Sequence, residues 1–334
     1  KSLAKNVSAK KNFDSPSGIC CSYYWNGNSV DEKIVMEELL AIDKLKEKPK
    51  FMYVQIDAGY SSKIGDWLDF KKNFPSGFKK IVAEIKKRGY EAGIWIAPFV
   101  AHPKSKLALN HKECFLRDRL GRFVEGRRTT PFDRRIRGIN FRVADPTNRE
   151  FLKHLGGVIK EFVDSGFMLI KLDFLYSVCL YGNYSKRKTR FEALREGISY
   201  IREIVGEKVH LLSGIAPMMP MVGLIDSARV GTDSLNPWIC KVPILKKLIN
   251  NSMMRKNINN SLIRRFLNGI LWTNDADCVF FRKGTGISRD VIEVHKKLAK
   301  IGGGSLWLGD SLKNLSFEET EEMLDYFNDY LEKK

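Results

Sequence analysis

The sequence has no hydrophobic run close to the roughly twenty residues that a membrane-spanning helix needs. Its first residues, KSLAKNVSAKKNF, lack the apolar segment of a secretory signal. These two absences predict a cytoplasmic protein with no membrane partner.

Motifs for metals, disulfides and dinucleotides are also missing. The six cysteines are scattered without a C-x-x-C pair, and the five histidines show neither H-x-x-x-H nor Cys/His spacing. In a chain of this length such cysteines favour a reducing compartment over a disulfide framework, and a zinc site is not expected. No G-x-G-x-x-G follows any predicted strand. We therefore expect no metal and no cofactor.

Acidic residues are few relative to basic ones, 39 against 57, which gives a formal net charge of +18. Residues 117–137 carry eight arginines, and residues 241–265 carry seven Lys and Arg and no acid. Such segments suit a nucleic acid or another anionic partner, a solvated basic face, or a patch that meets an acidic domain or a second copy of the chain. No nucleic-acid-binding module accompanies the charge, so no nucleic acid partner is expected, and a homo-oligomer stays open.

The 334 residues, 43% of them hydrophobic, are enough for a full core. Short apolar runs alternate with helical stripes, which is typical of repeated βα units. The predicted strands are Gly18–Tyr24, Phe51–Ile56, Glu91–Ala97, Phe167–Leu172, Val209–Ser213, Ser227–Val230, Gly269–Thr273 and Ser305–Leu308. The predicted helices are Asp31–Lys46, one opening near Pro75, Asn148–Asp164, Arg190–Val205, Met253–Phe266, Ser288–Ile301 and Phe317–Leu331.

Eight strands that alternate with helices predict an α/β fold of the (β/α)₈ barrel type. A doubly wound open sheet is the alternative, but the strand count fits closure better. We expect residues 1–16 to form a lead-in segment and residues 17–334 to form the barrel. The connection from Pro98 to Asp145 is too long for an idle loop, and its segment FLRDRLGRFVEG predicts a small hairpin around Leu120-Gly121.

The active site of a (β/α)₈ barrel lies at the carboxyl ends of its strands. Polar and aromatic residues at these strand ends are therefore the candidates for the site. They are Asp57, Trp95, Lys171, Asp173, Arg229 and Asp233, and further Asn274, Asp275, Asp277 and Asp310.

Lys171 and Asp173 are two residues apart, so a strand places both side chains on one face. Two charged groups that point into a barrel mouth are costly unless they serve a function. The ammonium should keep the Asp173 carboxylate ionised, as a nucleophile or an electrostatic stabiliser must be. An interior ion pair, or an Asp173 that caps the following turn, is the alternative.

Arg229 and Asp233 flank a glycine, Gly231, which would let the loop bend sharply. Two carboxylates on opposite sides of one barrel mouth suit glycoside hydrolysis, in which one attacks the anomeric carbon and the other protonates the leaving oxygen. Asp233 could instead be a loop residue in an Asx-turn. Trp95 offers an apolar platform for a sugar face or is a plain core tryptophan, and Asn274 to Asp277 could be turn formers.

The chain resembles the catalytic barrel of the melibiase-like α-galactosidases, glycoside hydrolase family 36 of clan D. The motifs that carry the resemblance keep the family's order. They are SYYW at Ser22–Trp25, QIDAGY…IGDW at Gln55–Trp67, GIWIAPF at Gly93–Phe99, KLDFL at Lys171–Leu175, SGIAPMMPMVGLIDSARVGTD at Ser213–Asp233 and WTNDADC at Trp272–Cys278.

The resemblance implies a retaining exo-α-glycosidase, with α-galactoside oligosaccharides or glycoconjugates as its substrates. It assigns the nucleophile to Asp173 and the general acid/base to Asp233, and it assigns the pocket for the terminal sugar to Asp57, Trp95, Lys171 and Arg229. Transglycosylation, as in raffinose synthases, and an inactive glycan- or partner-binding barrel are the alternatives.

Two features depart from the family's pattern. The flanking β-domains that are usual in the family are absent from this sequence. The second acid that usually follows the aspartate of the second motif is replaced by Ala58. We expect Ala58 at the rim of the pocket, with looser discrimination at the exocyclic hydroxymethyl group of the sugar as the consequence.

Overall fold

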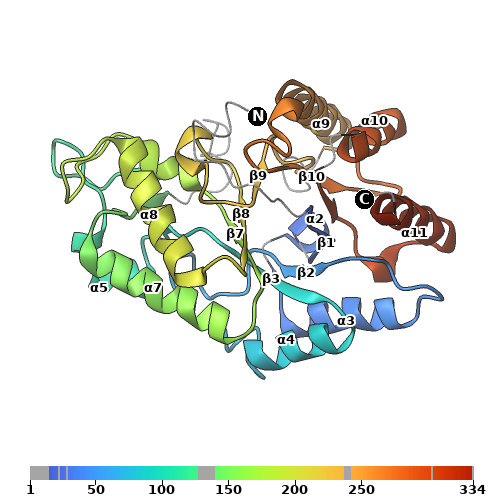
Figure 1. Ribbon diagram of the computed structural model, residues 1–334, viewed down its shortest axis with the longest axis horizontal. Helices are drawn as coiled ribbons and strands as arrows, with labels where there is room; N and C mark the ends of the chain where they lie inside the picture. Colours follow the sequence, from blue (N-terminus) through green and yellow to red (C-terminus); the bar gives the residue numbers. More distant parts are fainter. Residues whose placement is uncertain are drawn as a thin grey trace.

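The computed structural model describes residues 15–21, 23–27, 29–126, 140–236, 242–301 and 304–332. Within these residues, eight parallel strands close into a barrel with helices around it (Figure 1). The strands are β1 (Ser17–Cys21), β2 (Tyr53–Ile56), β3 (Glu91–Ile96), β7 (Leu169–Leu172), β8 (His210–Ser213), β9 (Ser227–Arg229), β10 (Thr273–Val279) and β11 (Ser305–Leu308). Their order around the barrel is β1-β11-β10-β9-β8-β7-β3-β2. The (β/α)₈ prediction is confirmed, and the described residues contain no flanking β-domain.

The helices cover the barrel with one apolar face each. They are α3 (Glu32–Asp43), α4 (Phe78–Lys87), α7 (Arg149–Asp164), α8 (Arg190–Val205), α9 (Pro243–Arg264), α10 (Arg289–Ile301) and α11 (Phe317–Glu332). In α4, Phe78, Ile81, Val82 and Ile85 are buried, at the spacing of one helical face. None of the described helices is both long and apolar enough to cross a membrane.

The long connection after β3 contains a second, small sheet. Strands β4 (Val100–Ala101), β6 (Phe141–Val143) and β5 (Glu125–Gly126) pair antiparallel in that order. The predicted hairpin is present, because Arg117 pairs with Phe123 and Gly121 turns the chain at a φ of 75°. The arginine-rich segment 117–137 lies outside the described residues from position 127 onward.

The end of the first strand differs from the prediction. β1 stops at Cys21, and Tyr23–Asn26 form the short helix α2. Tyr24 packs edge-on against Phe280, with ring centroids 5.1 Å apart, and its hydroxyl donates to Asp277. These tertiary contacts turn the chain across the barrel mouth and override the strand preference of the aromatic residues.

The seventh strand is displaced along the sequence. The prediction was Gly269–Thr273, whereas β10 runs from Thr273 to Val279 and contains Asn274, Asp275 and Asp277. Carboxylates in a fully buried strand contradict the usual polarity pattern. They are tolerated here because Arg229 forms ion pairs with both Asp275 and Asp277.

The basic helix is longer than predicted. We expected Met253–Phe266, but α9 begins at Pro243 and ends at Arg264. Proline is favoured in a first helical turn. The first turns of α9 expose Ile244, Leu245 and Leu248 instead of burying them, so they lack the apolar stripe that identified the other helices.

Candidate active site

Asp57 and Lys171 form a buried ion pair at the barrel mouth. Lys171 Nζ lies 3.0 Å from Asp57 Oδ2, and the two side chains are 12% and 3% exposed. The same carboxylate oxygen accepts from Gln55 Nε2 at 2.6 Å and from the Cys20 thiol at 3.3 Å. Burial alone would lower the pKa of Lys171, but the Asp57 carboxylate outweighs it and holds this pKa well above its ordinary value.

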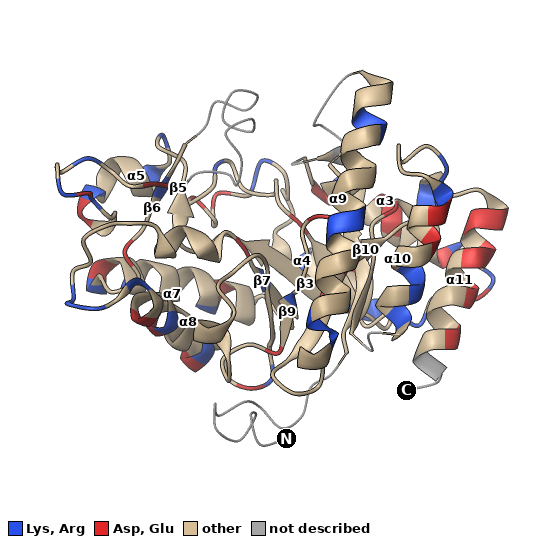
Figure 2. Cartoon of the chain, turned by 90° about the horizontal axis from the view of Figure 1, so that it is seen from above, with Lys and Arg blue, Asp and Glu red and all other residues tan. Residues whose placement is uncertain are grey.

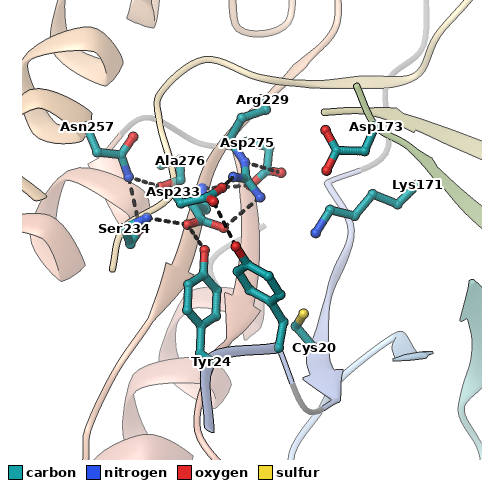
Figure 3. Close-up of polar contacts among 12 residues, drawn as sticks. Cys20, Tyr24, Lys171, Asp173, Arg229, Asp233, Ser234, Asn257, Asp275 and Ala276 are labelled. Atoms are coloured by element: carbon teal, nitrogen blue, oxygen red, sulfur yellow. Dashed lines mark hydrogen bonds and ion pairs between the residues drawn. The ribbon is translucent and has the colours of Figure 1, made fainter. Parts of the chain in front are cut away.

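The partner of Lys171 corrects the sequence prediction. Lys171 and Asp173 do share one side of the strand end (Figure 3). The Lys171 ammonium, however, pairs with Asp57 and not with Asp173. The order of the strands in the barrel explains this choice of partner. Asp57 follows β2, Lys171 lies in β7, and both strands flank β3, so their inward side chains meet across it.

Asp173 is fixed by backbone and aromatic donors. Trp95 Nε1 donates to Oδ2 at 3.1 Å, and the Phe174 amide donates to Oδ1 at 2.7 Å. Phe174, the residue that provides this amide, adopts a left-handed φ of 54°. A Cβ on Gly214 would lie 2.6 Å from Oδ1, so the absence of a side chain there makes room for the carboxylate.

Trp95 is buried, with 3% of the residue exposed, and packs edge-on against Trp67 at 5.8 Å and Phe174 at 6.4 Å. It is therefore more than a core residue, because its indole N–H orients Asp173.

Arg229 joins three carboxylates. Its Nε lies 3.2 Å from Asp275 Oδ2, its Nη2 lies 2.6 Å from Asp277 Oδ1, and its Nη1 lies 3.2 Å from Asp233 Oδ1. Burial opposes its charge, but Asp277 and Asp275 raise the pKa of Arg229 well above its ordinary value. Asp277 also accepts from the Ser234 amide at 2.6 Å, and Arg229 lowers the pKa of Asp277 despite burial. The two acids in β10 are thus ion-pair partners of Arg229, and the Asp275 carboxylate also accepts from the Asp277 amide at 2.8 Å, as in an Asx-turn.

Asp233 is set apart from the other acids by its exposure and its pKa. Its side chain is 37% exposed, whereas Asp275 and Asp277 are 1% exposed. Partial desolvation in the barrel mouth and the charges of Asp277 and Asp173 raise the pKa of Asp233 to about 6, although Arg229 opposes them. The Tyr23 hydroxyl donates to its Oδ2 at 3.1 Å. Asp233 is therefore the group in this cluster that can hold a proton near neutral pH.

A side chain of α9 supports the loop that carries Asp233. Asn257 Nδ2 donates to Ser234 Oγ at 3.0 Å and to the Ala276 carbonyl at 2.7 Å (Figure 3). A Cβ on Gly231 would lie 1.5 Å from Asn257 Oδ1. Gly231 is therefore needed for this close approach, and its φ is not positive.

Three other candidates lie outside this cluster. Asp310 is fully buried and accepts from the amides of Phe281 and Arg282, so it joins the ends of β10 and β11. Asn274 donates to the Arg264 carbonyl at 3.0 Å and fixes the end of α9. Ala58 begins the turn after β2, as expected, and its side chain is 6% exposed and packs in the hydrophobic core.

Sequence reasoning missed Tyr23 and Tyr24 as site residues. Both belong to the SYYW motif, but the predicted first strand extended through them, so they were not counted as strand-end residues. Nothing in the sequence indicated a role for Asn257, because an asparagine in a basic helix is expected to lie at the surface.

No family model matches the sequence. Among solved structures, the chain is similar to the α-galactosidase from Thermus thermophilus in complex with stachyose, at 25% identity and a TM-score of 0.80 over 97% of this chain and 67% of that chain. For the same enzyme in complex with p-nitrophenyl α-D-galactopyranoside the values are 25%, 0.81, 97% and 64%. The chain is a glycoside hydrolase barrel of the α-galactosidase kind.

A family 36 α-galactosidase from Geobacillus stearothermophilus shares this fold, at 13% identity and a TM-score of 0.68 over 99% of this chain and 44% of that chain. The α-galactosidase-like barrel thus spans about two thirds of the Thermus enzyme and less than half of the Geobacillus one.

Proposed function

We propose that this barrel is a retaining exo-α-glycosidase that acts on α-galactosides, with Asp173 as nucleophile and Asp233 as general acid/base. The observation that carries the proposal is the contrast between these two carboxylates. N–H donors on both oxygens orient Asp173, whereas the pKa of Asp233 is raised to about 6. A double displacement requires one carboxylate that is oriented for attack and a second that can donate a proton, and the surroundings of these two residues suit those two roles.

In the first step, an Asp173 oxygen attacks the anomeric carbon as the bond from that carbon to the aglycone oxygen breaks. Asp233 gives its proton to the departing oxygen, so the aglycone leaves as a neutral alcohol. The product is a glycosyl ester of Asp173. Trp95 holds the second Asp173 oxygen and thereby aims the attacking one.

In the second step, Asp233 acts as a base. It takes a proton from water while the water oxygen attacks the anomeric carbon, and the bond to Asp173 breaks. Asp233 is then protonated again and ready for the next cycle. The free sugar keeps its anomeric configuration because two inversions have occurred at one carbon.

The remaining predicted residues would bind the terminal sugar. Lys171 has two ammonium protons left after its contact with Asp57, and these can donate to sugar hydroxyls. Asp57 fixes the position of that ammonium. Arg229 keeps Asp233 in place through Nη1. Similar structures hold stachyose or p-nitrophenyl α-D-galactopyranoside, which supports a galactoside as the substrate.

Turnover of p-nitrophenyl α-galactoside tests the proposal, with proton NMR of the first sugar released. We expect release of p-nitrophenol and of galactose that is initially the α-anomer. Initial release of the β-anomer would refute retention. Absence of turnover would refute the enzymatic proposal and favour an inactive barrel that binds glycans or a partner. Product analysis at high sugar concentration separates hydrolysis from transfer to a sugar acceptor.

A further inference from the structure

Helix α9 presents an outer face with apolar ends and a basic middle. We define this outer face by Ile244, Lys247, Leu248, Arg255, Lys256 and Ile263. Ile244, Leu248 and Ile263 are 76%, 64% and 71% exposed, which is unusual for large aliphatic side chains. The opposite side of the helix is buried through Asn250, Met254, Asn257 and Ile258. The outer face is therefore a continuous stripe along a helix of 22 residues, about 33 Å long.

The cations of the outer face have no acidic partners among the described residues, since no ion pair involves Lys247, Arg255 or Lys256. Several cations elsewhere on the surface do have acidic partners, as in the pairs Arg88–Asp43, Lys106–Asp69 and Arg289–Glu322. Figure 2 shows that α9 carries only basic and uncharged residues, whereas the neighbouring α10 carries both signs and α11 carries acidic and uncharged residues. The positive potential of α9 is thus available to a partner.

An open groove of about 510 Å³ runs beside the cations. It is lined by Lys247, Leu248, Asn251, Ser252, Arg255, Lys256, Asn259 and Ser288. Ammonium, guanidinium, amide and hydroxyl groups on one wall are the donors that bind phosphate esters. Leu248, which is 64% exposed, also lines the groove, so an anionic group held there would lie next to an exposed aliphatic side chain.

We propose that the outer face of α9 binds the surface of an anionic phospholipid bilayer. The cations would contact phosphate head groups while Ile244, Leu248 and Ile263 enter the boundary of the acyl chains. A phosphate backbone of nucleic acid offers nothing to three exposed aliphatic side chains, and it would call for stacking aromatics instead. The two apolar ends lie 19 residues apart on one helix, which suits a flat surface better than the short groove of a protein partner. Contact of this kind needs no spanning helix and does not depend on the proposed function.

Sedimentation with vesicles tests this proposal. The chain should bind vesicles of phosphatidylglycerol and phosphatidylcholine and should not bind vesicles of phosphatidylcholine alone. The triple variant Lys247→Gln, Arg255→Gln, Lys256→Gln should bind roughly a hundredfold more weakly, at about fivefold per charge. The uncharged double variant Ile244→Ser, Leu248→Ser should lose about tenfold or more, because apolar area no longer enters the bilayer.

The matched control is the triple variant Lys79→Gln, Lys80→Gln, Lys87→Gln on α4. It removes the same charge from a helix that exposes no large apolar side chain in the described structure. Binding should be nearly unchanged. An equal loss in both triple variants would mean that net charge alone attracts the vesicles, and that refutes a defined face. Full binding by the Ile244/Leu248 variant would also refute the proposal and would point to a polyanion or an acidic protein. Absence of binding to the anionic vesicles refutes it outright.

Discussion

At the scale of single residues, Asp233 lies among groups that act on its proton in opposite directions. Burial and two neighbouring carboxylates favour the protonated form, and Arg229 and the Tyr23 hydroxyl favour the carboxylate. The proposed role needs the protonated form in the first step and the ionised form in the second. A pKa of about 6 allows both near neutral pH.

Replacing Asp233 should reduce activity most on substrates whose leaving group must be protonated. Asp233→Ala should retain far more activity on p-nitrophenyl α-galactoside than on melibiose, because p-nitrophenolate leaves without protonation. Asp173→Gly should abolish activity on both while the fold stays intact. The kcat/KM values of the two substrates provide the measurement. An equal loss on both substrates in the Asp233 variant would contradict its role as the acid.

Tyr23 should set where activity falls with pH. Because the acid must be protonated, kcat/KM on an unactivated galactoside should decline as pH rises above about 6, the pKa of Asp233. Tyr23→Phe removes a donor that stabilises the carboxylate, so the pKa of Asp233 should rise. We expect the falling limb to move to higher pH by about one to two units, since such hydrogen bonds contribute about 1.5–3 kcal/mol and one pKa unit corresponds to about 1.4 kcal/mol.

Tyr24→Phe is the control for this prediction. It removes a neighbouring hydroxyl that donates to Asp277 and not to Asp233. Asp277 keeps its contacts with Arg229 and the Ser234 amide. The pH profile of this variant should stay in place. A shift in both variants, or in neither, would argue against Tyr23 as the group that tunes Asp233.

Ala58 should be sensitive to charge because it is buried in the core. Ala58→Asp would bury a carboxylate beside Asp57 without a partner, and we expect the free energy of unfolding to fall by about 3–5 kcal/mol. Ala58→Ser, which adds a neutral hydroxyl, should cost about 1–3 kcal/mol. Urea unfolding measures both. If Ala58→Asp kept its stability and gained selectivity for galactose, the residue would face the sugar as the sequence suggested.

From the sequence, the residues of the candidate site could be predicted only where they follow a predicted strand or belong to a recognised motif. Asp173 and Asp233 were found because both follow strands and belong to ordered motifs. The partner of Lys171 could not be found, since it depends on which strands are neighbours in the closed barrel. Asn257 lies on a distant helix, and only the close approach of Gly231 reveals its contact with the loop.

At the scale of elements, two helical glycines differ in what surrounds them. Gly157 in α7 is exposed and has open space where a Cβ would be, whereas a Cβ on Gly197 in α8 would lie 2.6 Å from Phe99 and 2.7 Å from Pro146. Gly157→Ala should raise the free energy of unfolding by about 0.5–1 kcal/mol. Gly197→Ala should lower it by about 1–3 kcal/mol through overpacking. Denaturant midpoints of the two variants test the packing of α7 and α8, and equal shifts would contradict it.

The predicted elements fail where charge is buried or apolar residues are exposed. β10 was placed too early because Asp275 and Asp277 look like loop residues until Arg229 is brought beside them. The start of α9 was missed for the opposite reason, because Ile244 and Leu248 face outward. Periodicity identifies an element by its buried face, so it cannot identify elements whose polarity is set by a partner.

At the scale of the whole molecule, the number and order of the strands were predictable because each βα unit shows the same sequence pattern. A short apolar run that indicates a strand is followed by apolar residues at helical spacing. Parallel strands with helical crossovers have few ways to arrange, and closure of eight of them places all carboxyl ends at one mouth. That geometry assembles residues that are far apart in the sequence, from Tyr23 to Asp277.

The central claim is that Asp173 attacks the sugar and Asp233 assists it. The most direct test is covalent labelling with 5-fluoro-α-galactosyl fluoride, in which the reactive fluoride leaving group allows the first step while the ring fluorine slows the second. Peptide mass mapping should find one fluorosugar per chain, attached to Asp173, and the Asp173→Gly variant should stay unlabelled. A label on any other residue, or none on a chain that turns over p-nitrophenyl α-galactoside, would contradict the account.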